Sequence, residues 1–295
     1  MAKCNLCPRK CNADRTDDAF GYCRTGYIPE ASKAYLHMWE EPCISGTRGS
    51  GTVFFNGCNL RCIYCQNNAI SRGSGGKKLS CEELCQVFMN LKNKGAHNIN
   101  LVTPTHFAHA VAESIAMAKQ KGLDIPIVYN TGGYELVDTL RTLENHVDVY
   151  LPDFKYMDKE KARNYSLAED YPDIAKAAIE EMVRQKPNVN FNDEGIAVSG
   201  VIVRHLLLPG SLGNSKAVIE YLYKTYGDSI YISIMNQYTP SGKFPQYPEL
   251  SFTPSRREYE KLIDFALSLG VRNAYIQGEQ ASDKMYIPDF DFEGI

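Results

Sequence analysis

The sequence has neither a long apolar run nor a strong excess of charge of one sign. No segment keeps about 18 apolar residues together, so we expect no membrane-spanning helix. The first residues form no apolar stretch of the signal-peptide kind, and we therefore expect a cytoplasmic location. The 32 basic and 35 acidic residues leave a net charge of −3. This balance favours neither nucleic acid nor an anionic membrane as a partner.

Low-complexity tracts are also missing, and the composition is that of an ordinary globular protein. Hydrophobic residues make up 44% of the chain and charged residues 23%. The 295 residues are enough for one large domain and a small appendage. Ten cysteines stand out, because in a reducing compartment they favour metal ligation over disulfides.

Three of these cysteines are closely spaced. Cys58, Cys62 and Cys65 form a C-x3-C-x2-C array just after the apolar run 52–55. Each thiolate can bind one corner of an iron–sulfur cube, which leaves the fourth iron open for chemistry. Three reduced, buried cysteines or a zinc site are the alternatives. An electron-carrying cluster would need a fourth cysteine near Cys65, and none is there.

The first forty residues carry four more cysteines in ligand-like spacing, Cys4, Cys7, Cys11 and Cys23. This segment shows little regular periodicity and is too small to fold on apolar burial alone. We expect a second metal site there, with zinc and a second iron–sulfur cluster both open; a loop that is merely rich in cysteine is the alternative. The expected division is a cysteine-rich extension over 1–45, a main domain over 46–280 and a tail over 281–295.

The other cysteines and histidines carry weaker signals. Cys81 and Cys85 lie four apart on a predicted helix and are expected to be buried apolar residues. Cys43 has no partner in the sequence, and a catalytic role for it stays open. His106 and His205 follow predicted strands, so we expect them near a substrate.

From about residue 50 onward, strand-like and helical runs alternate six times. The strand-like runs are 52–57, 98–103, 126–131, 147–154, 198–208 and 229–238. The helical runs are 80–93, 106–123, 134–146, 158–186, 214–227 and 255–269. Such β-α units in series predict a parallel sheet with right-handed crossovers. Six units are too few for a closed eight-stranded barrel, so the predicted α/β fold is an open, partial (β/α)6 barrel.

Polar residues follow each predicted strand. Because ligands bind at the carboxyl ends of parallel strands, these residues predict one site on one rim. The cysteine array follows the first strand. The residues after the next five strands are Thr103 and Thr105, Asn130 and Thr131, Asp153 and Lys155, Arg204, and Gln237.

The array, with Tyr64 just before its third cysteine, resembles the signature of the radical S-adenosylmethionine (SAM) enzymes. Residues 50–240 are similar to activating enzymes of the pyruvate formate-lyase activase type. Asp153-Phe-Lys155 resembles the Asp-x-Lys motif of that group, and Arg204–Pro209 resembles its Arg-hydrophobic-Pro-Gly motif. Many members carry Gly-Gly-Glu after the second strand, where this chain has Thr103-Pro104-Thr105. One acidic ligand of SAM is therefore missing at that point.

The resemblance implies a cofactor set and a reaction. It implies a 4Fe–4S cluster on the three array cysteines, which act in catalysis through it, and SAM as the molecule that the cluster cleaves. The expected enzyme is a radical SAM oxidoreductase that forms a 5′-deoxyadenosyl radical and abstracts hydrogen, with a flavodoxin- or ferredoxin-type electron donor. The implied SAM-binding residues are Tyr64, Thr103, Thr105, Asn130, Thr131, Asp153, Lys155, Arg204 and Gln237.

The substrate is less defined than the chemistry. By resemblance, the first expectation is activation of a glycyl-radical enzyme, with a protein or peptide as substrate. A peptide-modifying or small-molecule radical SAM enzyme is the alternative within the family. A non-enzymatic iron–sulfur electron carrier is the alternative from another class. The N-terminal cysteines, together with Glu40-Glu41-Pro42, resemble a subgroup of these activases whose substrate does not follow from the resemblance.

Overall fold

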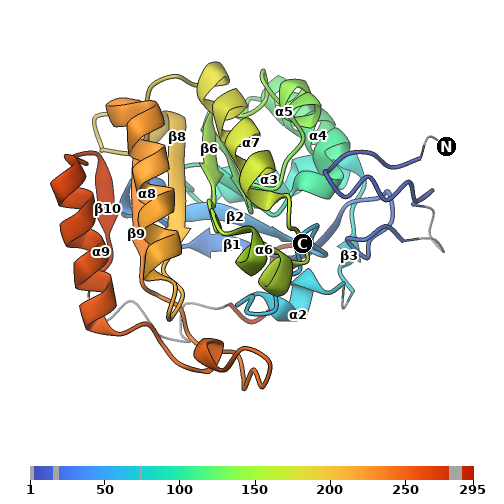
Figure 1. The fold of residues 1–295 in the computed structure, drawn as a ribbon. Helices are drawn as coiled ribbons and strands as arrows, with labels where there is room; N and C mark the ends of the chain where they lie inside the picture. The colour runs from blue at the N-terminus through green and yellow to red at the C-terminus, as the bar shows by residue number, and fades with distance from the viewer. Residues whose placement is uncertain (1–2, 16–19, 74, 279–287) are drawn as a thin grey trace.

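The computed structural model describes residues 3–15, 20–73, 75–278 and 288–295, and its centre is a parallel sheet (Figure 1). The sheet follows the order β2-β4-β5-β6-β8-β9-β10, and every neighbouring pair is parallel. The six predicted strands are all present, and β10 is added after them. The bounds are β2 Ser50–Phe55, β4 Ile99–Val102, β5 Ile127–Thr131, β6 Val149–Pro152, β8 Ala197–Leu206, β9 Tyr231–Met235 and β10 Ala274–Ile276. In the part of the chain that the structure describes, the first and last strands of the sheet do not pair with each other, so the sheet does not close into a barrel. This confirms the open α/β architecture.

The helices lie in an arc over one face of this sheet (Figure 1). Those of the repeated units are α3 Cys81–Asn93, α4 Ala108–Gln120, α5 Val137–Thr142, α6 Lys159–Ser166, α7 Tyr171–Gln185, α8 Leu212–Tyr226 and α9 Arg256–Leu269. The short helices are α1 Pro42–Ser45 and α2 Asn68–Ser71, with 3-10 turns at Thr105–Phe107, Gly227–Ser229 and Pro248–Ser251. Within the described ranges, no helix combines the length and apolar character needed to cross a membrane.

Local sequence signals account for where these helices begin and end. Ser80 accepts a hydrogen bond from the Glu83 amide and forms a capping box at the start of α3. Asp158 caps α6 by accepting from the amides of Glu160 and Lys161. The predicted helical run 158–186 is split into α6 and α7, because Leu167 adopts a left-handed conformation with φ of 51°.

The N-terminal segment contains a strand that the sequence pattern does not indicate. Strand β1, Glu30–His37, pairs antiparallel with β2 and with the short β3, Lys77–Lys78, and another short strand, β7 at Asn190–Phe191, pairs with β8. Both faces of β1 are covered, so its polar residues do not alternate with apolar ones as in a half-exposed strand. The strand lies inside the expected 1–45 extension, so the proposed boundary at residue 45 cuts across a paired part of the sheet.

The chain's last residues cover the outer side of β1. Lys33 is buried and pairs with Asp291 at 2.9 Å and with Glu293 at 3.1 Å. The Ala34 amide donates to the Glu293 carbonyl at 2.8 Å, and the Phe292 amide donates to the Ser32 carbonyl at 3.1 Å. The described part of the predicted tail, 288–295, therefore belongs to the main body of the fold.

Candidate functional site

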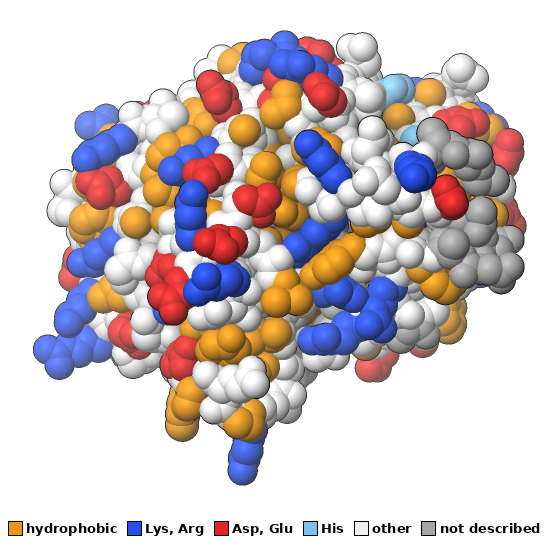
Figure 2. Space-filling view, turned by 45° about the vertical axis from the view of Figure 1, so that its right-hand side comes forward, with side chains coloured by type: hydrophobic (Ala, Val, Ile, Leu, Met, Phe, Trp, Pro, Cys, Tyr) orange, Lys and Arg blue, Asp and Glu red, His pale blue; other side chains and the backbone are white. Residues whose placement is uncertain are grey.

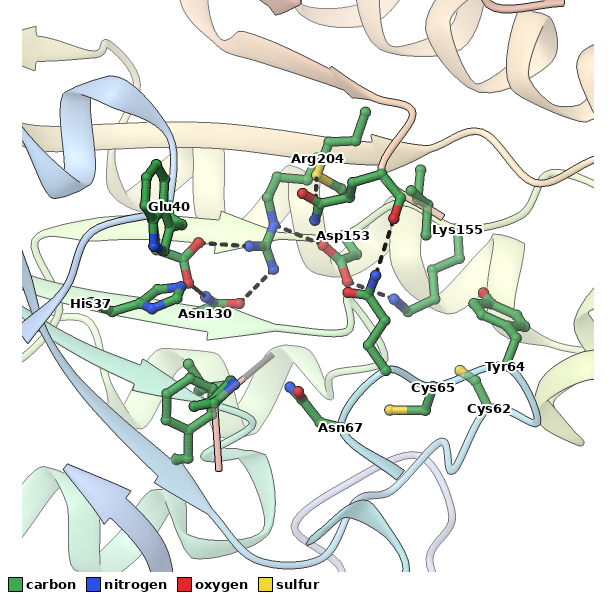
Figure 3. A pocket seen from close by; sticks show the side chains of 18 residues that line it. His37, Glu40, Cys62, Tyr64, Cys65, Asn67, Asn130, Asp153, Lys155 and Arg204 are labelled. Carbon is green, nitrogen blue, oxygen red and sulfur yellow. Dashed lines mark hydrogen bonds and ion pairs between the residues drawn. The ribbon is translucent and has the colours of Figure 1, made fainter. Parts of the chain in front are cut away.

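A cavity of about 210 Å³ lies at the carboxyl ends of the parallel strands (Figure 3). The array loop forms one wall, and residues from β5, β6 and β8 form the opposite wall. The sequence-predicted residues that line it are Cys62, Tyr64, Cys65, Asn130, Asp153, Lys155, Arg204 and Gln237. The structure therefore brings together side chains that are up to 175 residues apart in the chain.

A charged network crosses this cavity (Figure 3). Arg204 donates through Nε to Asp153 Oδ1 at 2.9 Å, through Nη1 to Glu40 Oε2 at 3.0 Å and through Nη2 to Asn130 Oδ1 at 2.6 Å. Lys155 Nζ pairs with the other oxygen of Asp153 at 2.5 Å. Two cations thus face two carboxylates in a partly enclosed space, an arrangement suited to the ammonium and carboxylate of an amino acid.

The titration of Asp153 follows from these contacts. Burial raises the pKa of its carboxyl group, but Arg204 and Lys155 outweigh burial and hold that pKa below its usual value. Burial lowers the pKa of Lys155, and Asp153 reverses this effect and raises it above the ordinary value. The pair therefore stays charged at neutral pH.

The three array cysteines occupy one loop after β2. Cys58 Sγ faces the amides of Leu60 at 3.3 Å and Arg61 at 3.5 Å, and Cys62 Sγ accepts from Ser166 Oγ at 2.9 Å. Cys62 and Cys65 line the cavity, whereas Cys58 is not among its lining residues. Burial raises the pKa of the Cys58 thiol to about 12.

These sulfurs suit an iron–sulfur cluster better than a single ion. No three His, Cys, Asp or Glu side chains in the described ranges converge as they stand on a point that could hold one metal ion. A cube does not need such convergence, because each thiolate binds a different iron atom. Soft sulfur ligands, with amide and hydroxyl donors turned toward Cys58 and Cys62, fit a thiolate-bound cluster.

The predicted threonines do not line the cavity. Thr105 is buried and donates to Glu135 Oε1 at 2.6 Å, and Thr131 donates to the same oxygen. Thr103 has a φ of 59°, and its amide donates to the Asn130 carbonyl at 2.8 Å. Thr105 and Thr131 are therefore joined by Glu135, a carboxylate that the sequence reasoning did not identify, and Thr103 contacts the backbone of Asn130.

Replacing Glu135 with glutamine is expected to change how stability depends on pH. Burial raises the pKa of Glu135 from 4.5 to about 7, so the folded protein holds a proton that the unfolded chain has already lost. The extra stability is complete below pH 4.5 and is lost as the pH rises through 7. Relative to Glu135→Gln, the free energy of unfolding of the unsubstituted protein should fall by on the order of 1–3 kcal/mol between these limits.

The measurement is anaerobic denaturant unfolding at several pH values. Glu160→Gln, which changes an exposed acidic residue on α6, is the matched control. Parallel profiles for the unsubstituted protein and Glu135→Gln would contradict the assigned titration.

Glu40, His37 and Asn67 also line the cavity, and the sequence reasoning did not place them there. Glu40 binds Arg204 through one oxygen and accepts from Asn100 and Asn130 amide groups at 3.2 Å through the other. No acid follows the second predicted strand, and this carboxylate supplies one from the segment after β1. The Glu40-Glu41-Pro42 sequence was the available signal for an acidic residue near the site. Nothing in its position along the chain predicted a contact between Glu40 and Arg204.

The remaining histidines and cysteines lie away from the cavity. His205 is fully buried between the Phe154 carbonyl and Ser215, and His106 contacts the Asn56 carbonyl at 2.8 Å. The expectation that these histidines meet a substrate is therefore wrong, because both side chains are used inside the fold. Cys43 and Cys85 are buried in apolar clusters, and Cys81 is partly buried on α3.

Two further hollows adjoin the main cavity. Their volumes are about 290 and 230 Å³, and both share Trp39, Glu40 and Gln237 with it. Glu41 lines the smaller one and is 8% exposed, and its Oε2 has no hydrogen-bond partner within the described ranges. Together these hollows extend the site beyond Arg204, on the side away from the cysteine loop.

Comparison with known proteins matches residues 52–210 to the radical SAM superfamily. An uncharacterized protein of Methanocaldococcus jannaschii is 28% identical over 275 residues, which are 89% of this chain and 74% of that protein. The pyruvate formate-lyase-activating enzyme of Clostridium pasteurianum is 28% identical over 181 residues, which are 58% of this chain and 66% of that enzyme, just under two thirds of its length. A radical SAM methyltransferase from Sphaerobacter thermophilus has the same fold, with a TM-score of 0.52, 17% identity, and coverage of 79% of this chain and 69% of that one.

Proposed function

The chain belongs to the radical SAM superfamily, and from that premise we propose that it is an oxidoreductase of the activating-enzyme kind that acts on a protein or peptide. Members of the superfamily use a 4Fe–4S cluster and SAM. When bound, the reduced cluster supplies the electron that cleaves SAM to methionine and a 5′-deoxyadenosyl radical, which takes a hydrogen atom from the substrate. The observation that carries the proposal is the Asp153–Lys155–Arg204 network facing Cys62 and Cys65 across one cavity.

Each cavity residue then has a defined task in our proposal. Cys58, Cys62 and Cys65 hold the cluster. Lys155 binds the carboxylate of the methionine group, and Asp153 or Glu40 accepts from its ammonium. Arg204 fixes both carboxylates in place, since it pairs with each at 2.9–3.0 Å. Asn130, Gln237 and Tyr64 line the remaining surface.

Thr103, Thr105 and Thr131 act indirectly in this scheme. Their contacts lie behind the cavity wall, so we assign them to positioning Asn130 rather than to touching SAM. The Thr103 amide holds the Asn130 carbonyl, and Glu135 joins the two other threonines. The three threonines thus remain part of the proposed SAM site, but they would position Asn130 instead of binding SAM directly.

A protein or peptide substrate is favoured because the main cavity continues into two further hollows that reach the surface. The hollows beyond Arg204 extend from the cavity past Trp39, which is 60% exposed at the surface. Figure 2 shows basic, acidic and hydrophobic side chains interspersed over one face of the molecule. Similarity to the Clostridium pasteurianum activating enzyme supports the same choice. A flavodoxin- or ferredoxin-type protein is the proposed electron donor.

The alternatives are less well supported. A radical SAM enzyme that acts on a small molecule, or that modifies a peptide instead of activating a glycyl-radical enzyme, would use the same cavity, and only its substrate would differ. A pure electron carrier would leave the buried network unexplained, because storing an electron needs no paired cations and carboxylates beside the cluster.

Yield of 5′-deoxyadenosine distinguishes these substrates. The anaerobic, dithionite-reduced protein is incubated with SAM alone, with the macromolecular fraction of an extract from the source organism, or with its small-molecule fraction. We expect the macromolecular fraction to raise the yield several-fold over SAM alone, because the radical is consumed productively. Boiled and protease-treated macromolecular fractions are the controls. Stimulation by the small-molecule fraction alone would contradict the protein-substrate proposal and leave SAM cleavage standing.

A further inference from the structure

The four N-terminal cysteines lie near one another in the fold, although in the described ranges their sulfurs do not converge as they stand on one point that could hold a metal ion. A Cβ atom placed on Gly21 would lie 3.3 Å from Cys11 Sγ and 3.4 Å from Cys23 Sγ. Cys4 lies within hydrogen-bonding reach of Cys11, and Cys7 lies close enough to Cys4 and Cys23 to interact with both electrostatically. Cys11 and Cys23 therefore lie on either side of the position where Gly21 has no side chain, and Cys4 and Cys7 lie next to them.

The backbone around these sulfurs resembles a ligand loop more than a packed segment. Lys10, Asn12, Arg15 and Arg24 all have φ between 40° and 64°, in the left-handed region that L-residues rarely adopt. The amides of Ala13 and Tyr22 face the Cys11 sulfur, and the Arg9 amide faces that of Cys7. Amides turned toward sulfur are the outer-shell contacts that stabilise a thiolate ligand.

Apolar packing does not explain this conformation. In the described ranges 3–15 and 20–29, no residue belongs to a helix or strand. Phe20 is 56% exposed, so a large apolar side chain of the segment is left at the surface. Buried Arg15 fixes one part of the segment, because it donates to the His106 carbonyl at 2.5 Å and to the Gly26 carbonyl. A metal bound by four thiolates would fix the turns that carry the cysteines.

The same segment supports the loop of Cys58, Cys62 and Cys65. The Cys58 amide donates to the Cys23 carbonyl at 3.3 Å. Arg9 donates to the Asn59 carbonyl and to the Ser166 carbonyl, each at 2.8 Å. The guanidinium groups of Arg9 and Arg61 lie over the Tyr22 ring at 4.1 and 4.0 Å. Through these contacts the N-terminal segment holds the neighbouring loop of Cys58, Cys62 and Cys65 in place.

We propose that Cys4, Cys7, Cys11 and Cys23 bind a second metal centre, closed by four thiolates, which holds the N-terminal segment against the loop of Cys58. Its occupant is a thiolate-seeking metal, either a zinc ion or an iron centre. Because all four ligands come from the protein, this centre is structural and leaves no position open for substrate. The sulfurs draw together when the metal replaces the thiol protons, as metal binding and local folding are coupled.

Metal content of the full-length protein, purified without oxygen, tests the site. We expect zinc, or iron and sulfide beyond one 4Fe–4S cluster, in the unsubstituted protein. Cys4→Ser with Cys11→Ser, which changes the two less buried ligands, should lose this extra metal and keep the four irons of the other loop. Cys81→Ala with Cys85→Ala removes two thiols from α3 and should keep both centres. Equal metal content in all three proteins would overturn the proposal.

Two further measurements guard against a folding artefact. Cobalt added to the metal-free protein should give the strong sulfur-to-cobalt charge-transfer absorption of thiolate ligation, and the Cys4, Cys11 variant should lose it. Amide exchange over residues 57–60 should be at least tenfold faster in that variant than in the α3 control. Unchanged absorption would overturn the ligand assignment, and unchanged exchange would overturn the role in holding the loop. Both readouts are independent of SAM cleavage, so they stand apart from the proposed function.

Discussion

Replacing Cys58, Cys62 and Cys65 together with alanine is expected to abolish reductive cleavage of SAM. The three sulfurs are the only cysteines of the loop after β2, and Cys62 and Cys65 face the charged network. Without thiolate ligands the loop cannot hold a cluster, and no other group within the described cavity supplies an electron to SAM. Product formation should fall below the detection limit, and four irons per chain should be lost.

The assay is anaerobic formation of 5′-deoxyadenosine with dithionite, together with iron and sulfide analysis. Cys81→Ala is the matched control, since Cys81 lies on α3 outside the cavity, and it should retain both cluster and activity. Product formation by the triple variant at the control's rate would show that the cleavage site lies elsewhere.

Replacing Lys155 with alanine is expected to weaken SAM binding by roughly ten- to a hundredfold. Lys155 is the cation of the cavity closest in sequence to Asp153, and its ammonium pairs with that carboxylate at 2.5 Å. Loss of a contact with a charged ligand group costs about 1.5–3 kcal/mol, which corresponds to this range of affinity. Arg204 remains paired with Asp153 in the variant, so the wall should keep its shape.

Titration of the cluster-loaded protein with SAM provides the measurement. Lys159→Ala removes an exposed lysine that pairs with Asp173, fourteen residues further along the chain, and its SAM affinity should be unchanged. If Lys155→Ala binds SAM as tightly as this control while its iron content is intact, Lys155 serves only to pair with Asp153.

The sequence predicts the parallel part of the fold because each buried strand keeps its apolar residues together and a helix with its own capping residues follows. In the structure Ser80 and Asp158 cap helices α3 and α6, and glycines with positive φ follow the ends of α3, α4, α8 and α9, at Gly95, Gly122, Gly227 and Gly270. Strand β1 does not follow such a pattern. Its lysine is neutralised by Asp291 and Glu293, more than 250 residues away, and no local pattern signals such a partner.

The same distinction applies to the site: residues in the repeated units could be predicted, and residues from outside them could not. Asp153, Lys155, Asn130 and Arg204 could be predicted, because polar residues at the ends of parallel strands must share one rim. Thr105 and Thr131 follow the same rule, yet their hydroxyl groups turn toward Glu135 instead of the cavity. Side-chain direction at a strand end depends on the nearest partner. Glu40 enters from the segment that follows the antiparallel strand β1, outside the repeated units, so this rule does not predict its place.

The covering of β1 by the last residues also sets an order of events during synthesis. Lys33 emerges from the ribosome early, but its partners at 291 and 293 are made some 260 residues later, about 13 to 50 s at ordinary elongation rates. Until then the outer edge of β1 presents unpaired amides and carbonyls, as any open sheet edge does. The repeated units from β2 to β9 can pair with their neighbours in turn as they appear. Completion of the sheet at the outer edge of β1 is therefore a late, long-range closure.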